Sequence, residues 1–326
     1  MEQRVLGRTG MRVSVLGYGA GAVGGLMVRG APAEQERSLA RALEAGITYV
    51  DTAAMYGNGE SERTLGRLLK ALKVRPQIGT KVRLAPEARG DIPGGIAASL
   101  EASLGRLGLD AVDLFQLHDP IGSPGGYTVQ QVLEEAVPAL QRLREQGKCR
   151  FLGITALGEV PALRQVLASG AFDTAQVPYN LLNPSWLGAL PPGLPGQDFQ
   201  RLGEEAAGQG VGLIGIRILA AGALSGDAAR HPVAMPSVAP IASASEYDTD
   251  LANARRLLPL VAEGHAASLA ELAIRFAITR PEIGTALIGT ASVEQLELAI
   301  AATGKGPLPP ETLARIAAVQ AGGQAG

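Results

Sequence analysis

The chain has 326 residues, 29 of them basic and 31 acidic, and a formal net charge of −2. Charges of both signs are spread along the sequence, so it lacks the basic patch of proteins that bind nucleic acid or anionic membranes, and a small-molecule partner is favoured. Cys149 is the only cysteine, which excludes an internal disulfide and a cysteine-cluster metal site.

The length permits one large domain. A chain of this size buries about three quarters of its unfolded surface, and α/β barrels commonly reach about 250 residues or more as one unit. Two domains of average size are the alternative, and we expect a single domain over residues 1–326. With neither a basic leader before an apolar core nor an apolar run of about 18 residues, we also expect a cytoplasmic protein without a membrane span.

The N-terminal residues predict a hairpin, a strand and a loop. The turn-forming Arg8-Thr9-Gly10 lies between apolar residues, which predicts a hairpin over residues 3–14. Val13 to Leu16 is predicted as a strand. Residues 19–24 have the G-x-G-x-x-G spacing of dinucleotide-binding folds, but helical periodicity starts only near Ala33. We therefore predict a flexible loop whose glycines leave room for a ligand, rather than a Rossmann domain.

Helix-period segments then alternate with short apolar runs. The helical segments lie near 33–45, 60–73, 94–107, 128–147, 158–169, 199–209, 267–278 and 292–302. The apolar runs lie near 47–51, 77–82, 111–117, 150–155, 173–178, 211–215 and 284–288. Strands separated by helices pair in parallel, and with the first strand the count reaches the eight that close a barrel. The sequence predicts an α/β fold, a (β/α)8 TIM barrel with a short N-terminal β-hairpin.

Two loops and a tail interrupt this pattern. Residues 191–196 read Pro-Pro-Gly-Leu-Pro-Gly and precede the sixth helix. A long loop at about 226–248 holds three prolines and is either a cover over a ligand or a disordered insertion. The tail 321–326 has no core-forming residues, and we expect it to fray.

Four polar side chains follow three successive predicted strands. Asp51 ends an apolar β-branched run, and Tyr56 comes five residues later. Lys81 and His118 end the next two strands. The carboxyl ends of parallel strands meet at one face of a barrel, where α/β proteins place reactive groups. We therefore expect all four side chains to share one mouth.

Tyr56 is the candidate general acid. A phenol ordinarily has a pKa near 10, so giving up a proton near neutral pH requires a neighbouring positive charge. An ammonium at about 4 Å contributes about 4 kcal/mol at an effective dielectric constant near 20, more than the roughly 2.7 kcal/mol needed to lower a pKa by two. Lys81 would supply this charge, and Asp51 would keep Lys81 ionised despite burial.

Two roles are open for His118. A neutral imidazole can donate a hydrogen bond that orients the substrate carbonyl, whereas passing a proton with Tyr56 requires the protonated form. Each of the four residues also has a purely structural alternative. Asp51 could cap the end of its strand, Tyr56 could pack in the core or at its rim, and Lys81 could extend into solvent. His118 could be a structural histidine whose hydrogen bonds are all made within the protein. Their combination at successive strand ends favours a functional site.

The sequence holds no serine nucleophile elbow, metal-ligand cluster or phosphate-binding P-loop. An acid without a nucleophile or a metal needs another group to attack a carbonyl, and hydride from a nicotinamide fits. An aldolase or isomerase that uses Lys81 as a Schiff base is the alternative from a different class.

These residues resemble the tetrad of the aldo-keto reductase family. The likeness is close at Asp51-Thr52-Ala53, Tyr56-Gly57, Gly59 to Glu62, Thr80-Lys81 and Leu117-His118, and it runs from Leu6 to about Ala301. The resemblance implies a (β/α)8 barrel, NADPH or less often NADH as cofactor, no metal, and reversible reduction of an aldehyde or ketone to an alcohol. It also implies that Tyr56 and His118 contact the substrate.

By position, the resemblance implies a cofactor site made of several stretches. Thr155 and Gln176 would hold the nicotinamide carboxamide, residues 219–224 would bracket the pyrophosphate, and residues 289–295 would reach the adenosine. The expected cofactor contacts are Gly19, Ala20, Gly21, Asp51, Thr155, Gln176, Arg217, Leu219, Ala220, Gly222, Leu224, Gly289, Thr290, Ala291 and Gln295.

The sequence departs from its relatives in three places. Thr155-Ala156 stands where many have Ser-Asn, and the aromatic residue that commonly stacks on the nicotinamide is absent, so Arg217 would stack there or contact a phosphate. Near the adenosine, Ala291 and Leu298-Ala299 replace the Arg or Lys and the Glu-Asn of relatives that bind NADPH. NADPH is the implied cofactor, and NADH is the alternative.

We therefore predict an NAD(P)H-dependent oxidoreductase that reduces aldehyde or ketone groups of small molecules, or runs in reverse on alcohols, sugars or lactols. The alternative within the resemblance is a redox-sensing subunit that binds the cofactor with little turnover. The physiological substrate, the reaction direction and the oligomeric state are not established by the sequence.

Overall fold

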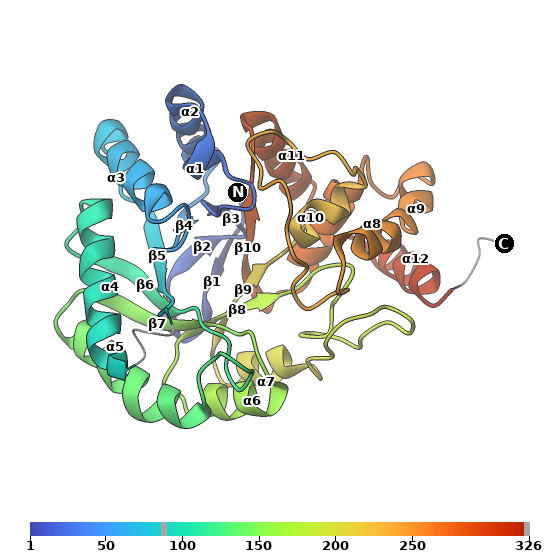
Figure 1. Cartoon of the computed structure of the whole chain (residues 1–326). Coiled ribbons are helices and arrows are strands. Elements are labelled where there is room, and N and C mark those ends of the chain that lie inside the picture. The colour runs from blue at the N-terminus through green and yellow to red at the C-terminus, as the bar shows by residue number, and fades with distance from the viewer. Residues whose placement is uncertain (86–89, 323–326) are drawn as a thin grey trace.

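Eight parallel strands form a closed barrel. The computed structural model describes residues 1–85 and 90–322. Within these residues the strands follow the order β10-β3-β4-β5-β6-β7-β8-β9 around the barrel, and helices surround them (Figure 1). The predicted (β/α)8 barrel is confirmed.

The barrel strands are short and lie where the apolar runs predict them. Side chains of successive strand residues point to opposite faces, so each strand offers one face to the barrel interior and one to the helices. The strands are β3 Leu16–Gly19, β4 Tyr49–Asp51, β5 Gln77–Val82, β6 Val112–Leu117, β7 Cys149–Thr155, β8 Thr174–Pro178, β9 Gly212–Ile216 and β10 Ile283–Gly289.

The helices cover the predicted segments, and further helices occur in both halves of the chain. They are α1 Leu26–Arg29, α2 Pro32–Glu44, α3 Glu60–Leu72, α4 Ile92–Leu107, α5 Val137–Glu145, α6 Val160–Ala168, α7 Leu202–Gly208, α8 Tyr247–Arg255, α9 Leu258–Ala262, α10 Leu269–Thr279, α11 Val293–Gly304 and α12 Pro310–Gln320. A π-helical segment, η3 Gln131–Ala136, precedes α5. Four of these helices were not predicted from the sequence: α1, α8, α9 and α12. Within residues 1–85 and 90–322, none of the helices combines the length and the apolar character that a membrane span requires.

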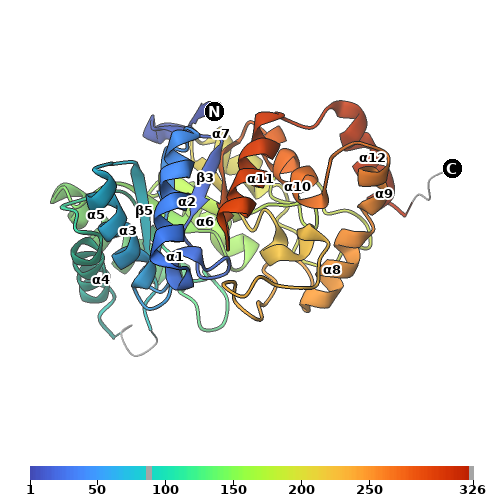
Figure 2. The same cartoon turned by 90° about the horizontal axis from the view of Figure 1, so that it is seen from above.

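The N-terminal hairpin closes the amino end of the barrel. Its strands β1 Gln3–Val5 and β2 Arg12–Ser14 pair antiparallel around the 3-10 turn η1 Gly7–Thr9. Leu6 of the hairpin is fully buried. It lies so close to Gly212, the first residue of β9, that a Cβ on Gly212 would be 2.8 Å from the backbone of Leu6. Figure 2 shows the hairpin at the edge of the barrel beside the N-terminus.

The single strand predicted over Val13 to Leu16 was wrong. The chain leaves the hairpin at Ser14 and enters the barrel at Leu16. Between them, the Val15 N–H bonds to the Glu2 carbonyl of the hairpin at 3.0 Å, so the break is fixed by a contact distant in sequence.

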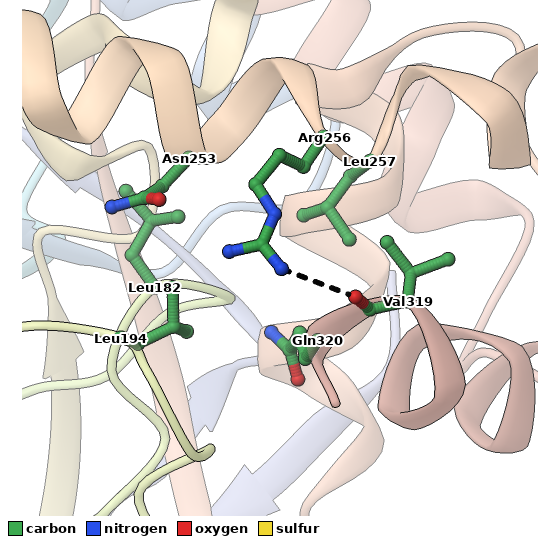
Figure 3. Close-up of a pocket in the computed structure, with 7 residues that line it drawn as sticks. All are labelled: Leu182, Leu194, Asn253, Arg256, Leu257, Val319 and Gln320. Atoms are coloured by element: carbon green, nitrogen blue, oxygen red, sulfur yellow. Dashed lines mark hydrogen bonds between the residues drawn. The ribbon is translucent and has the colours of Figure 1, made fainter. Parts of the chain in front are cut away.

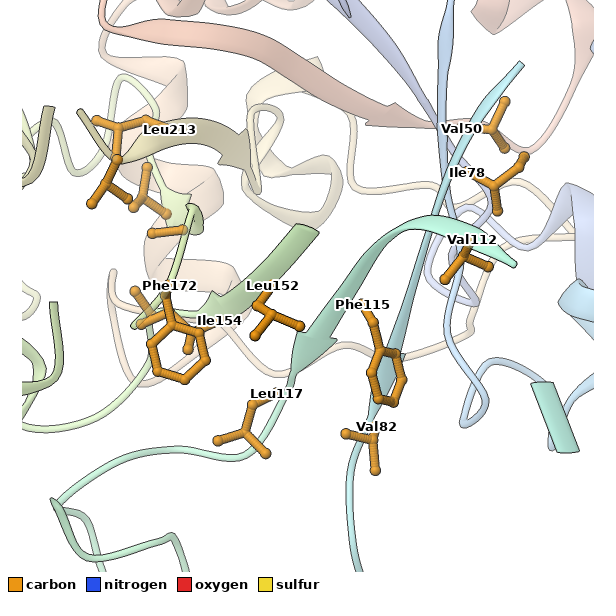
Figure 4. Packing of buried hydrophobic residues seen from close by; sticks show 14 of the residues in the cluster. Val50, Ile78, Val82, Val112, Phe115, Leu117, Leu152, Ile154, Phe172 and Leu213 are labelled. Atoms are coloured by element: carbon orange, nitrogen blue, oxygen red, sulfur yellow. The ribbon is translucent and has the colours of Figure 1, made fainter. Parts of the chain in front are cut away.

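Apolar residues of the strands pack outward against the helices. Val50, Ile78, Phe115 and Leu152 have no exposed surface and belong to one cluster that fills the space between barrel and helices (Figure 4). Their neighbours in the strands point inward by alternation, which turns residues such as Asp51 toward the barrel interior. The fold therefore presents polar groups at the inner carboxyl ends of the strands.

We predict that Arg4→Ala destabilises the barrel by about 2 kcal/mol, because charged hydrogen bonds contribute about 1.5–3 kcal/mol. The Arg4 guanidinium donates to the carbonyls of Arg280, Ile283 and Ile278 at 2.8 to 3.0 Å, which joins the hairpin to the start of β10. Urea unfolding measures the change. Arg12→Ala, an exposed position of the same hairpin, is the control, and equal losses for both variants would contradict the prediction.

Candidate active site

Asp51 and Lys81 form a buried ion pair at the carboxyl ends of neighbouring strands β4 and β5. Their exposed fractions are 3% and 1%. The Lys81 ammonium donates to Oδ1 of Asp51 and, at 2.9 Å, to the Thr52 carbonyl. Burial alone would lower the pKa of Lys81, but the attraction of Asp51 and Tyr56 outweighs it, and the pKa is raised. Asp51 and Tyr56 therefore favour the charged ammonium form of Lys81 at the barrel mouth.

Tyr56 lies against this cation. Lys81 Nζ is 3.1 Å from the phenol oxygen and 4.7 Å from the ring centroid. The turn that carries Tyr56 is held at both sides, because its N–H bonds to the Ala53 carbonyl at 3.1 Å and its carbonyl accepts from the Ser61 N–H at 3.2 Å. The phenol is thus fixed beside the ammonium.

His118 follows β6 and faces the same phenol. The His118 and Tyr56 rings are 6.5 Å apart and perpendicular. Burial, and then the positive charges of Lys81, Arg83 and Arg217, lower the pKa of His118 to about 3. The imidazole is therefore neutral at physiological pH, which favours the hydrogen-bonding role over the proton-passing role.

Thr155 and Gln176 connect His118 to Asp51. Nδ1 of His118 is 2.6 Å from Oγ1 of Thr155, at the end of β7. The Thr155 hydroxyl donates to Oε1 of Gln176 at 3.3 Å, and Nε2 of Gln176 donates to Oδ2 of Asp51 at 2.6 Å. The structure thus places both predicted carboxamide-binding residues in one hydrogen-bonded chain with the strand-end residues.

Two further polar side chains touch Asp51 and were missed by the sequence analysis. The Tyr49 hydroxyl donates to Oδ2 of Asp51 at 3.3 Å, and Nε2 of Gln116 reaches the same oxygen at 3.4 Å. The signal was present, because Tyr49 lies two residues before Asp51 and Gln116 two residues before His118, and such pairs share one face of a strand.

Arg217, directly after β9, carries a buried guanidinium nitrogen. Its backbone has φ of 57°, in the left-handed region, and its carbonyl accepts from Nδ2 of Asn180 at 2.8 Å. Nη1 is buried and has no hydrogen-bond partner among the described residues. Burial lowers the pKa of Arg217 more than Tyr56 raises it. A buried donor without a partner is costly, which points to an acceptor that binds there.

The other predicted cofactor residues lie at the carboxyl ends of the neighbouring strands β3, β9 and β10 or on the loops that follow them, with Gly19 and Gly289 as the last residues of β3 and β10. Residues 220–225 form the short helix η4 after β9. The loops after β3 and β10 touch, since a Cβ on Gly24 would lie 2.6 Å from the Thr290 carbonyl. Residue 24 must therefore be a glycine, because any side chain would collide with the backbone of the loop after β10. Gln295 is engaged locally, because its Oε1 accepts from the Ala291 N–H at 2.8 Å beside the α11 N-cap.

Residues 229–235, named here the strap, join the loop after β9 to the loop after β3. Arg230 donates to the carbonyls of Met235 at 2.6 Å and Ala221 at 2.8 Å. The Met235 N–H bonds to the Val23 carbonyl at 3.0 Å, and Nε of Arg29 bonds to the Val233 carbonyl at 2.7 Å. This part of the long loop predicted at 226–248 therefore crosses the strand-end face along a path with defined contacts.

Two cavities in the described chain lie away from these residues. The smaller, of about 10 Å³, is enclosed by α8, α12 and the loops after β8, where Arg256 donates to the Val319 carbonyl at 3.5 Å (Figure 3). The larger, of about 360 Å³, lies between the loop after β8 and helices α10 and α12. Neither contains a predicted site residue. No cluster of His, Cys, Asp and Glu side chains suited to a metal occurs within residues 1–85 and 90–322.

We predict that His118→Gln flattens the pH dependence of stability. Between pH 6.5 and about 3 the unfolded chain protonates this residue and the native chain does not, so stability rises with pH across that window. From pH 6.5 down to pH 5 the wild type should lose about 2 kcal/mol through His118. Urea unfolding at both pH values measures it, and equal losses in wild type and variant would refute the assignment.

Comparison with known proteins identifies the family. The profile described as Aldo/keto reductase family matches residues 15–321. L-galactose dehydrogenase from Arabidopsis thaliana is 30% identical over 313 residues, which cover 93% of this chain and 88% of that protein. L-glyceraldehyde 3-phosphate reductase from Escherichia coli O157:H7 is 27% identical over 343 residues, which cover 97% and 91%.

A solved structure supports the fold. A Bacillus halodurans aldo-keto reductase in its holo form matches with a TM-score of 0.72 and 24% identity, over 98% of this chain and 96% of that one. With a barrel mouth that carries the strand-end residues described above, the chain belongs to the aldo/keto reductase family and is an NAD(P)-dependent oxidoreductase.

Proposed function

We propose that this chain reduces aldehyde or ketone groups of small molecules to alcohols, or catalyses the reverse, with Tyr56 as general acid and base. The observation that carries the proposal is the 3.1 Å contact between Lys81 Nζ and the Tyr56 oxygen, in which the cation is itself held by buried Asp51. A fixed positive charge stabilises the phenolate that remains after Tyr56 gives up its proton.

The roles of the side chains follow from this contact. A bound nicotinamide supplies or accepts the hydride. Tyr56 gives its proton to the carbonyl oxygen in reduction and takes the hydroxyl proton in oxidation. His118, being neutral, acts as a hydrogen-bond partner of the substrate oxygen. Asp51 holds Lys81 in place and charged.

The chain's own polar groups support a dinucleotide at the mouth. Nη1 of Arg217 is a buried donor without a partner among the described residues, which suits a phosphate oxygen or the carboxamide. Thr155 and Gln176 lie beside His118 and are proposed to hold the nicotinamide carboxamide. We further propose that residues 19–21, 219–224 and 289–295 border the rest of the cofactor, since they occupy neighbouring strand ends.

The adenosine end decides between NADPH and NADH. Ala291 carries no charge to meet a 2′-phosphate, and Leu298 is an apolar side chain with 66% of its surface exposed. Because neither side chain is charged, neither selects for the 2′-phosphate of NADPH. NADH is therefore proposed as an equal candidate beside the NADPH expected from the resemblance. Titration with both cofactors separates the two.

The Schiff-base alternative is disfavoured by the state of Lys81. An amine must lose its proton before it attacks a carbonyl, and burial beside apolar groups serves that end in Schiff-base enzymes. Here the pKa of Lys81 is raised, because Asp51 and Tyr56 more than offset burial.

We predict that Tyr56→Phe lowers kcat about 10²- to 10⁴-fold, the usual contribution of general acid catalysis. The reaction is followed by the absorbance of NADPH or NADH with a panel of small aldehydes. Cofactor binding, measured by fluorescence titration, should be retained, because the phenol oxygen is assigned to proton transfer.

Tyr18→Phe is the matched control. Its hydroxyl bonds to Ser38 of α2 at 2.9 Å, outside the barrel mouth, so turnover should stay at the wild-type value. A Tyr56→Phe variant as active as Tyr18→Phe would refute the role of Tyr56.

We predict that Arg217→Met weakens cofactor binding about 10- to 100-fold, the worth of a charged hydrogen bond. Fluorescence titration of NADPH and NADH gives the dissociation constants. Arg12→Met is the control, because Arg12 is exposed on the N-terminal hairpin at the amino end of the barrel, away from the strand-end mouth. Unchanged affinity in Arg217→Met, or equal losses in both variants, would show that Arg217 does not bind the cofactor.

A further inference from the structure

We propose that Arg83 binds an anionic group of the substrate, so that the carbonyl compounds preferred by this chain carry a carboxylate or a phosphate a short carbon chain away from the carbonyl. The proposal rests on the proposed function and deepens it, because it names a substrate class for the same barrel mouth. Arg83 contacts the substrate and selects among substrates, whereas proton transfer stays with Tyr56.

The side chain of Arg83 faces the barrel mouth. Val82, the last residue of β5, is buried in the cluster between the barrel and the helices (Figure 4), and so is Leu84. Side chains of successive residues along a strand point to opposite faces. Arg83, between two outward-facing residues, is therefore turned inward, on the same face as Lys81 two residues earlier.

Arg83 and His118 are neighbours across two adjacent strands. β5 and β6 pair in parallel, with Val82 opposite Leu117. The His118 N–H bonds to the Val82 carbonyl at 2.8 Å, which carries the pairing past the last residues of both strands. Paired strands lie about 4.8 Å apart, so the backbone at Arg83 runs beside the backbone at His118. An oxygen atom held by His118 is thus within a short carbon chain of Arg83.

The guanidinium of Arg83 is not neutralised. The side chain is exposed and makes no hydrogen bond or ion pair with another residue of the described chain, 1–85 and 90–322. The ammonium of Lys81, in contrast, is paired with Asp51. The charge of Arg83 acts in the mouth, because together with Lys81 and Arg217 it lowers the pKa of His118.

A carboxylate on the adjacent strand does not cancel this charge. Asp119 follows β6, is fully buried and accepts a hydrogen bond from the Leu84 N–H at 3.3 Å. No ion pair joins Asp119 to Arg83, although the structure describes both residues. A guanidinium offers a planar pair of donors that matches a carboxylate or a phosphate. The unpaired cation beside the residue that meets the substrate oxygen carries the proposal.

Matched aldehydes test the preference. Succinic semialdehyde and butanal share a four-carbon chain and differ by a carboxylate, and glycolaldehyde phosphate and glycolaldehyde differ by a phosphate. The absorbance of NADPH or NADH gives kcat/KM for each. We expect the wild type to prefer the anionic member of at least one pair, and the two pairs distinguish a carboxylate from a phosphate. No preference for the anionic member in either pair would overturn the proposal.

Variants assign the preference to Arg83. In Arg83→Met the ratio of kcat/KM between the preferred anionic aldehyde and its neutral partner should fall about 10-fold, the lower limit for a hydrogen bond to a charged group, because the side chain is exposed. Arg83→Lys keeps the charge without the planar fork and should retain part of the preference. Arg83→Glu should reverse it.

Arg12→Met is the matched control, since it removes an exposed arginine at the amino end of the barrel, and its ratio should equal that of the wild type. A ratio in Arg83→Met equal to that in Arg12→Met would overturn the proposal. Equal losses for the anionic and the neutral aldehyde would do the same, because they would show that Arg83 acts only through His118.

A binding measurement separates this proposal from the proposed function. Lack of turnover of all these aldehydes with both cofactors would refute carbonyl reduction. The protein loaded with NADP⁺ or NAD⁺, which carries no hydride to transfer, is therefore also titrated calorimetrically with succinic semialdehyde and with glycolaldehyde phosphate. Weaker binding of one of them by Arg83→Met than by Arg12→Met is expected. Equal affinities for both compounds would overturn the role of Arg83, whatever the turnover.

Discussion

The polar groups of the barrel mouth are organised around the buried ion pair between Asp51 and Lys81. Removal of one partner of such a pair leaves an unpaired buried charge, at a cost of about 3–5 kcal/mol. The remaining polar groups are arranged around this pair: Gln176, Gln116 and Tyr49 donate to Asp51. On the other side, the Thr52 carbonyl and the Tyr56 oxygen lie next to Lys81. The pair fixes Tyr56 in place, and through Gln176 and Thr155 it also reaches the imidazole of His118.

Most of the barrel could be predicted because its elements alternate in type. Each strand from 47–51 onward is a short apolar run, and each helix before the seventh strand has a clear stripe of apolar residues. The prediction failed where tertiary contacts decide, as at Val15, which pairs with the hairpin and divides one run into two strands. Helix α12 had usable signals, a proline at its first position followed by Leu313 and Ile316 at helical spacing.

The site could be predicted only to the level of single strand ends. Alternation along a strand shows which residues point inward, so Asp51, Lys81 and His118 could be placed at one mouth. Contacts between strands depend on register, which the sequence leaves open. The hydrogen bonds that link His118 to Thr155 and Thr155 to Gln176 join the ends of three strands. They could not be predicted from the sequence and are seen only in the structure. The backbone of Arg217, in a conformation rare for residues with side chains, has no sequence signal at all.

The barrel is completed by its first and last strands, since β3 pairs with β10 and Gly19 lies opposite Gly289. Almost the whole chain lies between these partners, and contacts so distant in sequence form slowly. While the protein is being synthesised, the edge of β3 therefore waits unpaired until β10 leaves the ribosome, and such an edge can associate wrongly. The loops after β3, β9 and β10 therefore come together only once β10 has been made, whereas the strands from β3 to β9 can pair with their neighbours earlier.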